Sequence, residues 1–219
     1  NPGVFIFKGN EELPGGIYLL ASQAKVKLME FIIDENQHFS FETDTTDILK
    51  NIVVKGCPEN ILFFDYIKSI TQKQIEINKL STDLKKAEDG HDANLTKSLK
   101  EKVTQKSKEL QDFTLAFINN NPKLLFSKIL SVNRDIDIPE YPKLPNGTVD
   151  STFGWKYYKA NYWMYTDLLD DRIIRTPVFV GKLQRYFDNV IVQDNDSIKF
   201  EADKILETVR PNEEMFKYV

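Results

Sequence analysis

Three closely spaced carboxylates are the first residues of this sequence that could do chemistry. Asp167, Asp170 and Asp171 follow a stretch rich in aromatic residues, and paired acids beside aromatic rings are typical of a glycosidase site. However, Asp170 and Asp171 directly precede Arg172 and Arg175. We therefore expect these acids to form local ion pairs or to solvate the end of a helix, and we keep a hydrolase that uses them as an alternative.

The sequence offers little for nucleophilic or metal chemistry. It holds one cysteine, Cys57, and two histidines, His38 and His91, which lie far apart. A single thiol forms no intrachain disulfide and no two-cysteine redox motif, so we expect Cys57 to be a small buried side chain. Glycine-rich phosphate loops, G-x-S-x-G and H-E-x-x-H motifs do not occur. We expect no catalytic residue, cofactor or metal within this sequence.

Trp163 is the main candidate for binding. At helical spacing it shares a strip with Lys156 and Lys159, outside the apolar stripes. An exposed tryptophan among polar neighbours can mark a binding surface, to which Tyr141 of a neighbouring loop could contribute. Alternatively, Trp163 packs under a loop, with residues 139–145 as the candidate cover.

The element that would position these side chains is residues 153–169, which seven aromatic residues dominate. Read as a helix, it has two opposed apolar stripes: Phe153, Tyr157, Ala160, Met164 and Leu168 on one side, and Trp155, Tyr158, Tyr162, Tyr165 and Leu169 on the other. A helix that is apolar on two opposed faces is usually packed on both. We therefore predict that 153–169 is the central helix of an α-rich domain.

The chain as a whole is predicted to be α+β. Residues 1–57 read as a partial antiparallel β module with strands at 4–7, 17–20, 28–33, 39–43 and 52–55. The glycines of the turn at 13–16 would supply positive φ angles, and 34–37 would be a hairpin loop. Residues 58–219 read as an α-helical domain that begins at Pro58.

Two features of the helical domain stand out. Residues 71–110 carry sparse apolar side chains near heptad spacing with a break at Gly90 and His91, which predicts a projecting helical hairpin arm or, alternatively, a self-associating coiled coil. Residues 134–151 hold three prolines spaced by three and predict an extended loop. We expect this loop to lie in a groove of its own domain, anchored by Ile136, Ile138, Tyr141 and Leu144.

Two later helices have recognisable starts. Thr176 and Pro177 would begin one whose core face is Val180, Leu183, Phe187 and Val190. Asp196 and Ser197 would begin another that carries Phe200, Ile205, Leu206 and Val209.

Composition narrows the class of protein. The 219 residues suffice for one large or two modest domains. A net charge of −4 argues against a nucleic-acid partner, and no apolar run approaches the ~20 residues that span a bilayer. The sequence opens without a Met and ends on apolar residues, so we expect it to be a piece of a longer polypeptide.

Several stretches together carry a family resemblance: residues 13–20, 32–45, 54–66, 145–163, 170–187, 192–198 and 212–219. They resemble the N-terminal region of thioredoxin-like, thiol-disulfide interchange lipoproteins of Bacteroidetes. That resemblance implies a small β domain and an α-helical domain, both of unknown function, ahead of a thioredoxin-fold domain with a C-x-x-C pair. It covers most of the chain and is weakest at 75–110.

The resemblance implies a role without catalysis for this region. The redox cysteines of the family belong to the downstream thioredoxin domain, so no catalytic residue carries over. We expect an accessory region that positions or selects substrate, in a periplasmic or cell-envelope protein held by a lipid anchor outside this sequence. A stand-alone binding module for envelope glycans or peptides is the alternative. Secreted proteins of the group that this chain resembles can carry O-glycans, and Asp44-Thr45-Thr46 and Asp150-Ser151-Thr152 fit the acceptor pattern loosely.

Overall fold

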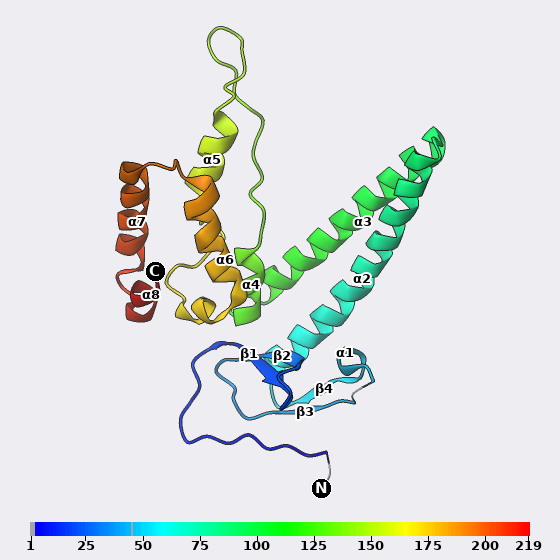
Figure 1. Ribbon diagram of the computed structural model, residues 1–219, viewed down its shortest axis with the longest axis vertical. Coiled ribbons are helices and arrows are strands. Elements are labelled where there is room, and N and C mark those ends of the chain that lie inside the picture. Colours follow the sequence, from blue (N-terminus) through cyan, green and yellow to red (C-terminus); the bar gives the residue numbers. More distant parts are fainter. Residues whose placement is uncertain (1–2, 45) are drawn as a thin grey trace.

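The structure, a computed structural model, describes residues 3–44 and 46–219 and is α+β, as predicted (Figure 1). The N-terminal part comprises β1 (Gly16–Ala21), β2 (Lys27–Ile33), β3 (Ser40–Glu42), α1 (Ile48–Asn51) and β4 (Val53–Lys55). The remainder comprises α2 (Pro58–Asp89), α3 (Ala93–Asn120), α4 (Leu125–Val132), α5 (Phe153–Asn161), the 3-10 helix η1 (Asp171–Arg175), α6 (Pro177–Arg185), the π-helical turn η2 (Tyr186–Val190), α7 (Asn195–Val209) and α8 (Glu213–Tyr218).

The strands form two separate antiparallel pairs, β1 with β2 and β3 with β4. The hairpin predicted at 34–37 is therefore wrong, because this loop connects two sheets instead of two paired strands. The strand predicted at 4–7 is also wrong. These residues adopt no regular structure, and Phe5 and Phe7 are 83% and 78% exposed. Apolar β-prone residues form a stable strand only where another strand satisfies their backbone groups.

Gly15 and Gly16 have a different purpose from the one predicted. Neither has a positive φ angle. Instead, a Cβ at Gly15 would meet the side chain of Arg172 at 2.7 Å, and one at Gly16 would meet Cβ of Arg175 at the same distance. The two glycines thus let the start of β1 approach η1 closely.

Ion pairs also stabilise the contact between the β module and η1. The Arg172 guanidinium binds the Asp170 carboxylate through two hydrogen bonds, of 2.8 and 2.7 Å, and its third nitrogen donates to Asp34 at 2.6 Å. The fork of arginine matches carboxylates in this way. The hydrogen bonds that Arg172 donates to Asp170, opposed by burial, raise the pKa of Arg172 above its ordinary value.

The first turn of α2 joins the β module to the helices. The Asn60 amide, fully buried, donates to the backbone oxygen of Ile32 at 2.7 Å and accepts from its N–H at 2.9 Å. Beside it, the Glu59 carboxylate accepts the backbone N–H of Phe126 in the first turn of α4 at 2.9 Å. Burial raises the pKa of Glu59, although the Phe126 bond opposes the shift. One cluster of buried side chains consequently runs from β2 to α8.

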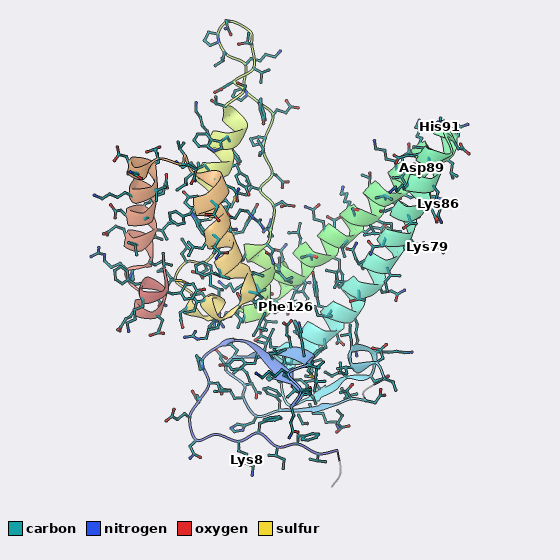
Figure 2. The ribbon with its side chains drawn as sticks, viewed as in Figure 1. Lys8, Lys79, Lys86, Asp89, His91 and Phe126 are labelled. Carbon is teal, nitrogen blue, oxygen red and sulfur yellow. The ribbon has the colours of Figure 1, made fainter. Side chains whose placement is uncertain are left out.

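The predicted helical arm is confirmed as an intrachain hairpin of α2 and α3 (Figure 1). The two helices pack through small and branched side chains such as Ile77, Ala87 and Leu99. The arm reverses at Gly90 and His91, where His91 has a φ of 56° (Figure 2). Self-association of this arm stays a prediction.

The prediction of a central helix at 153–169 is wrong. α5 ends at Asn161, and Gly154 is its one buried residue. The Asn161 amide donates to the Tyr157 carbonyl at 2.8 Å, a local bond of the kind that favours helix ends. Beyond it, Tyr162 turns into the core. The most buried side chains lie elsewhere, on β2, α4, η1, α6, α7 and α8: Ile32, Leu125, Ile173, Phe179, Val209 and Met215.

The loop at 134–151 does not lie in a groove. It extends beyond α5 (Figure 1), and three of its four expected anchors are exposed: Ile138, Tyr141 and Leu144. Tyr141 packs edge-on against the Phe153 ring, with centroids 5.7 Å apart, and its hydroxyl lies over Gly154. The prolines extend the chain as expected, but proline spacing carries no information about what the segment contacts.

We expect Gly154→Ala to release this loop. A Cβ at Gly154 would overlap the Tyr141 hydroxyl, and the exposed tyrosine can move away at low cost. Limited proteolysis within 134–151 should accelerate, while the free energy of unfolding changes by less than about 1 kcal/mol. Gly181→Ala, where an added Cβ meets nothing within 4 Å, is the matched control. Equal cleavage rates for both variants would contradict this role of Gly154.

Candidate functional site

A cleft of about 290 Å³ opens between the end of α4, α5 and α6. Three chain segments form its walls: residues 132–136, two tyrosines of the 158–162 stretch, and residues 177–185. Three side chains are cationic, Arg134, Lys182 and Arg185, and one is acidic, Asp135. Tyr158, Tyr162, Val178 and Ile136 are among its aromatic and apolar walls. A cleft of this size and mixed lining can hold a small ligand or one residue of a peptide.

Lys182 is the central polar group of this cleft. Its side chain is buried, and its ammonium donates to the backbone oxygen of Val132 at 2.8 Å. Val132 is the last residue of α4, so the lysine satisfies a carbonyl at the negative end of that helix. The ammonium also lies 5.2 Å from the centre of the Tyr162 ring. Burial, followed by repulsion from Arg185, lowers the pKa of Lys182 to about 8.

The two arginines of the cleft form no ion pair with any described residue of the chain. The Arg134 guanidinium lies 3.7 Å from the centre of the Tyr165 ring, a cation–π contact that leaves its N–H groups available. Arg185 is exposed at the end of α6. The lining therefore carries more positive than negative charge, although the whole chain is acidic at −4.

A buried polar network supports the wall behind the cleft. The Tyr162 hydroxyl donates to the Lys182 backbone oxygen at 2.8 Å, and burial raises its pKa to about 12. The Tyr186 ring packs at a tilt against Tyr162, and its hydroxyl donates to the Glu201 carboxylate at 2.7 Å. Lys159 pairs with the same carboxylate at 2.8 Å. Burial would raise the pKa of Glu201, but the bonds from Lys159 and Tyr186 outweigh it and lower that pKa.

The side chains expected to form a binding surface lie in different surroundings. Trp163 is partly buried against Tyr162 and Tyr186, with ring centroids 5.0 and 5.2 Å away. Trp163 therefore packs against other aromatic rings of the core, and its cover by residues 139–145 stays a prediction. Lys159 is engaged with Glu201, whereas Lys156 is exposed on α5 and Tyr141 lies on the loop. Whether the exposed members bind anything stays a prediction.

The local ion pairs predicted for Asp170 and Asp171 are confirmed. Asp170 pairs with Arg172 at 2.7 Å and Asp171 with Arg175 at 3.2 Å. Asp167 pairs with Lys128 at 2.9 Å, a partner that the sequence did not indicate. Burial would raise the pKa of Asp170, but the bonds from Arg172 lower it, which disfavours the protonated form that a general acid needs.

Cys57 is buried, as predicted, and its sulfur accepts a hydrogen bond from the Asn60 amide at 3.2 Å. Within residues 3–44 and 46–219, His, Cys, Asp and Glu side chains do not gather in a group of three or more that could hold a metal ion. In the same ranges, every helix is too short or too polar to cross a bilayer. Of the two O-glycan candidates, Thr45 lies outside the described residues, and Ser151 is exposed.

Sequence reasoning missed all three cations of the cleft. Lys182 lies on the buried stripe that runs from α6 into η2, together with Phe179 and Tyr186. A lysine at this position makes the stripe look like an exposed face in the sequence. Arg134 and Arg185 are separated by fifty residues of sequence and meet only in the fold. The polar interruption of an otherwise apolar stripe at Lys182 was the one available signal.

The comparisons with known proteins leave the family open. A scan against protein-family models, a search of curated proteins and a search of solved structures each found no match.

Proposed function

We propose that this chain is a non-catalytic accessory region of a cell-envelope thioredoxin-like thiol-disulfide oxidoreductase, where it positions or selects substrate. The observation that supports substrate binding is the cleft at Lys182. It presents cationic groups that have no ion-pair partner among residues 3–44 and 46–219, beside aromatic walls. The redox half is supported by the resemblance of residues 145–163 and 170–187, among others, to such lipoproteins. The attached thioredoxin-fold domain is the proposed partner, and a lipid anchor outside this sequence would hold the protein in the periplasm.

The redox half has a direct test. The downstream sequence of the same gene should encode a thioredoxin-fold domain with a C-x-x-C pair. An open reading frame without such a pair would contradict the proposed link to a thiol-disulfide oxidoreductase. It would not bear on binding at the cleft.

The accessory role is tested on the full-length protein with Arg185→Gln. This side chain is exposed and makes no hydrogen bond in the described chain, so the variant should fold normally. We expect a lower kcat/KM for protein substrates that need the cleft and an unchanged kcat/KM for a small disulfide compound. Lys97→Gln, on the exposed side of the arm, is the control with the same charge change. Equal activity and equal substrate range for the full-length protein and its isolated thioredoxin domain would contradict the proposal.

A stand-alone binding module for envelope glycans or peptides remains the second candidate. It is favoured by the loop at 134–151, which projects from the body and exposes Ile138, Tyr141 and Leu144. A glycan array and a peptide pull-down with this chain test it, with Tyr141→Ala as the variant expected to lose binding. Undiminished capture by that variant would contradict a role for the loop.

A further inference from the structure

Lys182, the buried cation of the cleft, has fewer partners among the described residues than a buried charge normally has. The ammonium of Lys182 has three N–H donors, and among the described residues it makes one hydrogen bond, to Val132. The residue is 8% exposed and lines the cleft, so its remaining donors are largely removed from bulk water. Buried charges are usually paired or fully hydrogen-bonded.

The neighbouring charges increase this imbalance. Arg185 lies three residues after Lys182 on α6 and lines the same cleft, so two like charges share it. Asp135 is the one acidic side chain in the lining, and it pairs with neither of them nor with Arg134. An anion bound between the cations would convert this repulsion into attraction.

The remaining walls limit what that anion can be. Tyr158, Tyr162, Val178 and Ile136 give the cleft aromatic and apolar surface beside the cations. A small inorganic ion would leave that surface in water, whereas an organic anion with an apolar body would cover it. Arginine also provides the two parallel donors that bind a carboxylate at both oxygens.

We propose that the cleft lined by Arg134, Lys182 and Arg185 binds a carboxylate carried on an apolar or aromatic body. Such a group is found on a small organic acid and at the C-terminal residue of a polypeptide. This inference deepens the proposed function, because it names the chemical group by which a substrate would be selected. It rests on the proposed function only in taking the bound carboxylate to be part of a substrate. Binding by this chain alone is a separate measurement, so failure of the redox half leaves it standing.

The test is an NMR titration of the chain near neutral pH with a matched pair of probes. N-acetylphenylalanine has the carboxylate and the ring, and N-acetylphenylalaninamide differs only in its neutral amide. The acid should shift signals of the cleft residues to saturation, and the amide should bind at least about tenfold more weakly, as expected for a lost bond to a charged group. An N-acetylated tripeptide that ends in phenylalanine distinguishes a polypeptide terminus from a small acid, since both sources share the carboxylate.

Variants show whether the cations cause the binding. Arg185→Gln should weaken N-acetylphenylalanine binding about tenfold, whereas Lys97→Gln should leave it unchanged. Lys182→Met should weaken N-acetylphenylalanine binding at least as much. The dispersion of the NMR signals of this variant shows whether it is folded. Binding should also weaken with added salt.

Four outcomes would overturn the proposal. They are equal binding of the acid and the amide, shifts that map outside the cleft, unchanged affinity in Arg185→Gln, and tighter binding of inorganic phosphate than of N-acetylphenylalanine at the same residues.

Discussion

Asn60→Ala is expected to lower the free energy of unfolding by about 3 kcal/mol, because it leaves two buried backbone groups of Ile32 without partners. The Asn60 amide bonds the N–H and the carbonyl of one residue on β2, as a neighbouring strand would. It also donates to the Cys57 sulfur at the start of α2. One side chain therefore joins the sheet β1–β2 to the first turn of the longest helix.

Two further variants separate the hydrogen bonds from the loss of volume. Asn60→Leu keeps a side chain of similar size and should destabilise the protein nearly as much as Asn60→Ala. Asn94→Ala, at an exposed position near the start of α3, should change the free energy of unfolding by less than about 0.5 kcal/mol. Chemical denaturation measures all three. If Asn60→Leu were as stable as the unsubstituted protein, the Ile32 bonds would not be what holds the junction.

The second large effect is a gain in stability with rising pH that depends on Lys182. Burial lowers the folded-state pKa of Lys182 to about 8, against 10.5 for an unperturbed lysine. Between these values the unfolded chain binds more protons than the folded chain, so the free energy of unfolding rises with pH. Below about pH 8 the lysine is charged in both states and contributes no pH dependence.

The rise in the free energy of unfolding that Lys182 causes is expected to end near pH 10. Tyr162 and Tyr186 have folded-state pKa values raised by burial, so above about 10 the unfolded chain loses their protons first and stability falls. Between pH 8 and 10, the Lys182 shift corresponds to a gain of about 2 kcal/mol. Denaturation at a series of pH values measures this gain.

Lys182→Met is the control for the pH effect. It keeps the apolar stem of the side chain and removes the titrating group, so its stability should be flat from pH 8 to 10. The charged and titratable groups that share the cleft, Arg134, Arg185, Asp135 and the two tyrosines, remain in place. A slope that persists unchanged in Lys182→Met would assign the pH dependence to another group.

Local signals in the sequence predicted local features of the fold. Pro58 starts α2, Thr176 and Pro177 start α6, and Gly90 with His91 reverses the arm. Each of these features depends on the conformational preference of one or two residues, which the chain carries wherever it folds. The α+β class followed from the same kind of information, namely the change from period-2 to helical spacing after residue 57.

Burial could not be predicted in the same way. The core face predicted for the helix that starts at Pro177 was Val180, Leu183, Phe187 and Val190. Val190 is buried and Leu183 and Phe187 pack against the core, but Val180 is exposed. The buried residues that the prediction left out are Phe179 and Lys182 on α6 and Tyr186 at the start of η2.

On α7, two of the apolar residues named from the sequence, Ile205 and Val209, are buried, whereas Phe200 is 66% exposed. The third buried residue of this helix is the charged Glu201. Lys182 and Glu201 are buried because partners from other helices, Val132 and Tyr186, satisfy them. Sequence periodicity contains no information about such partners.

The candidate site depends on contacts between distant segments. Arg134 follows α4, Tyr158 lies on α5 and Arg185 ends α6, and no spacing in the sequence indicates that they share one cleft. The aromatic residues of 153–162 drew attention to this region, but as a central helix. In the structure, Tyr158 and Tyr162 are instead a wall of the cleft.

The pKa of Lys182, measured by NMR of its side-chain ammonium group, tests most directly whether this cleft is built for an anion. In the free chain the pKa should lie near the value of about 8 that burial imposes. Saturation with N-acetylphenylalanine should raise it, because the carboxylate stabilises the charged ammonium. A saturated complex in which the Lys182 pKa is unchanged or lower would contradict the assignment of these cations as a carboxylate site.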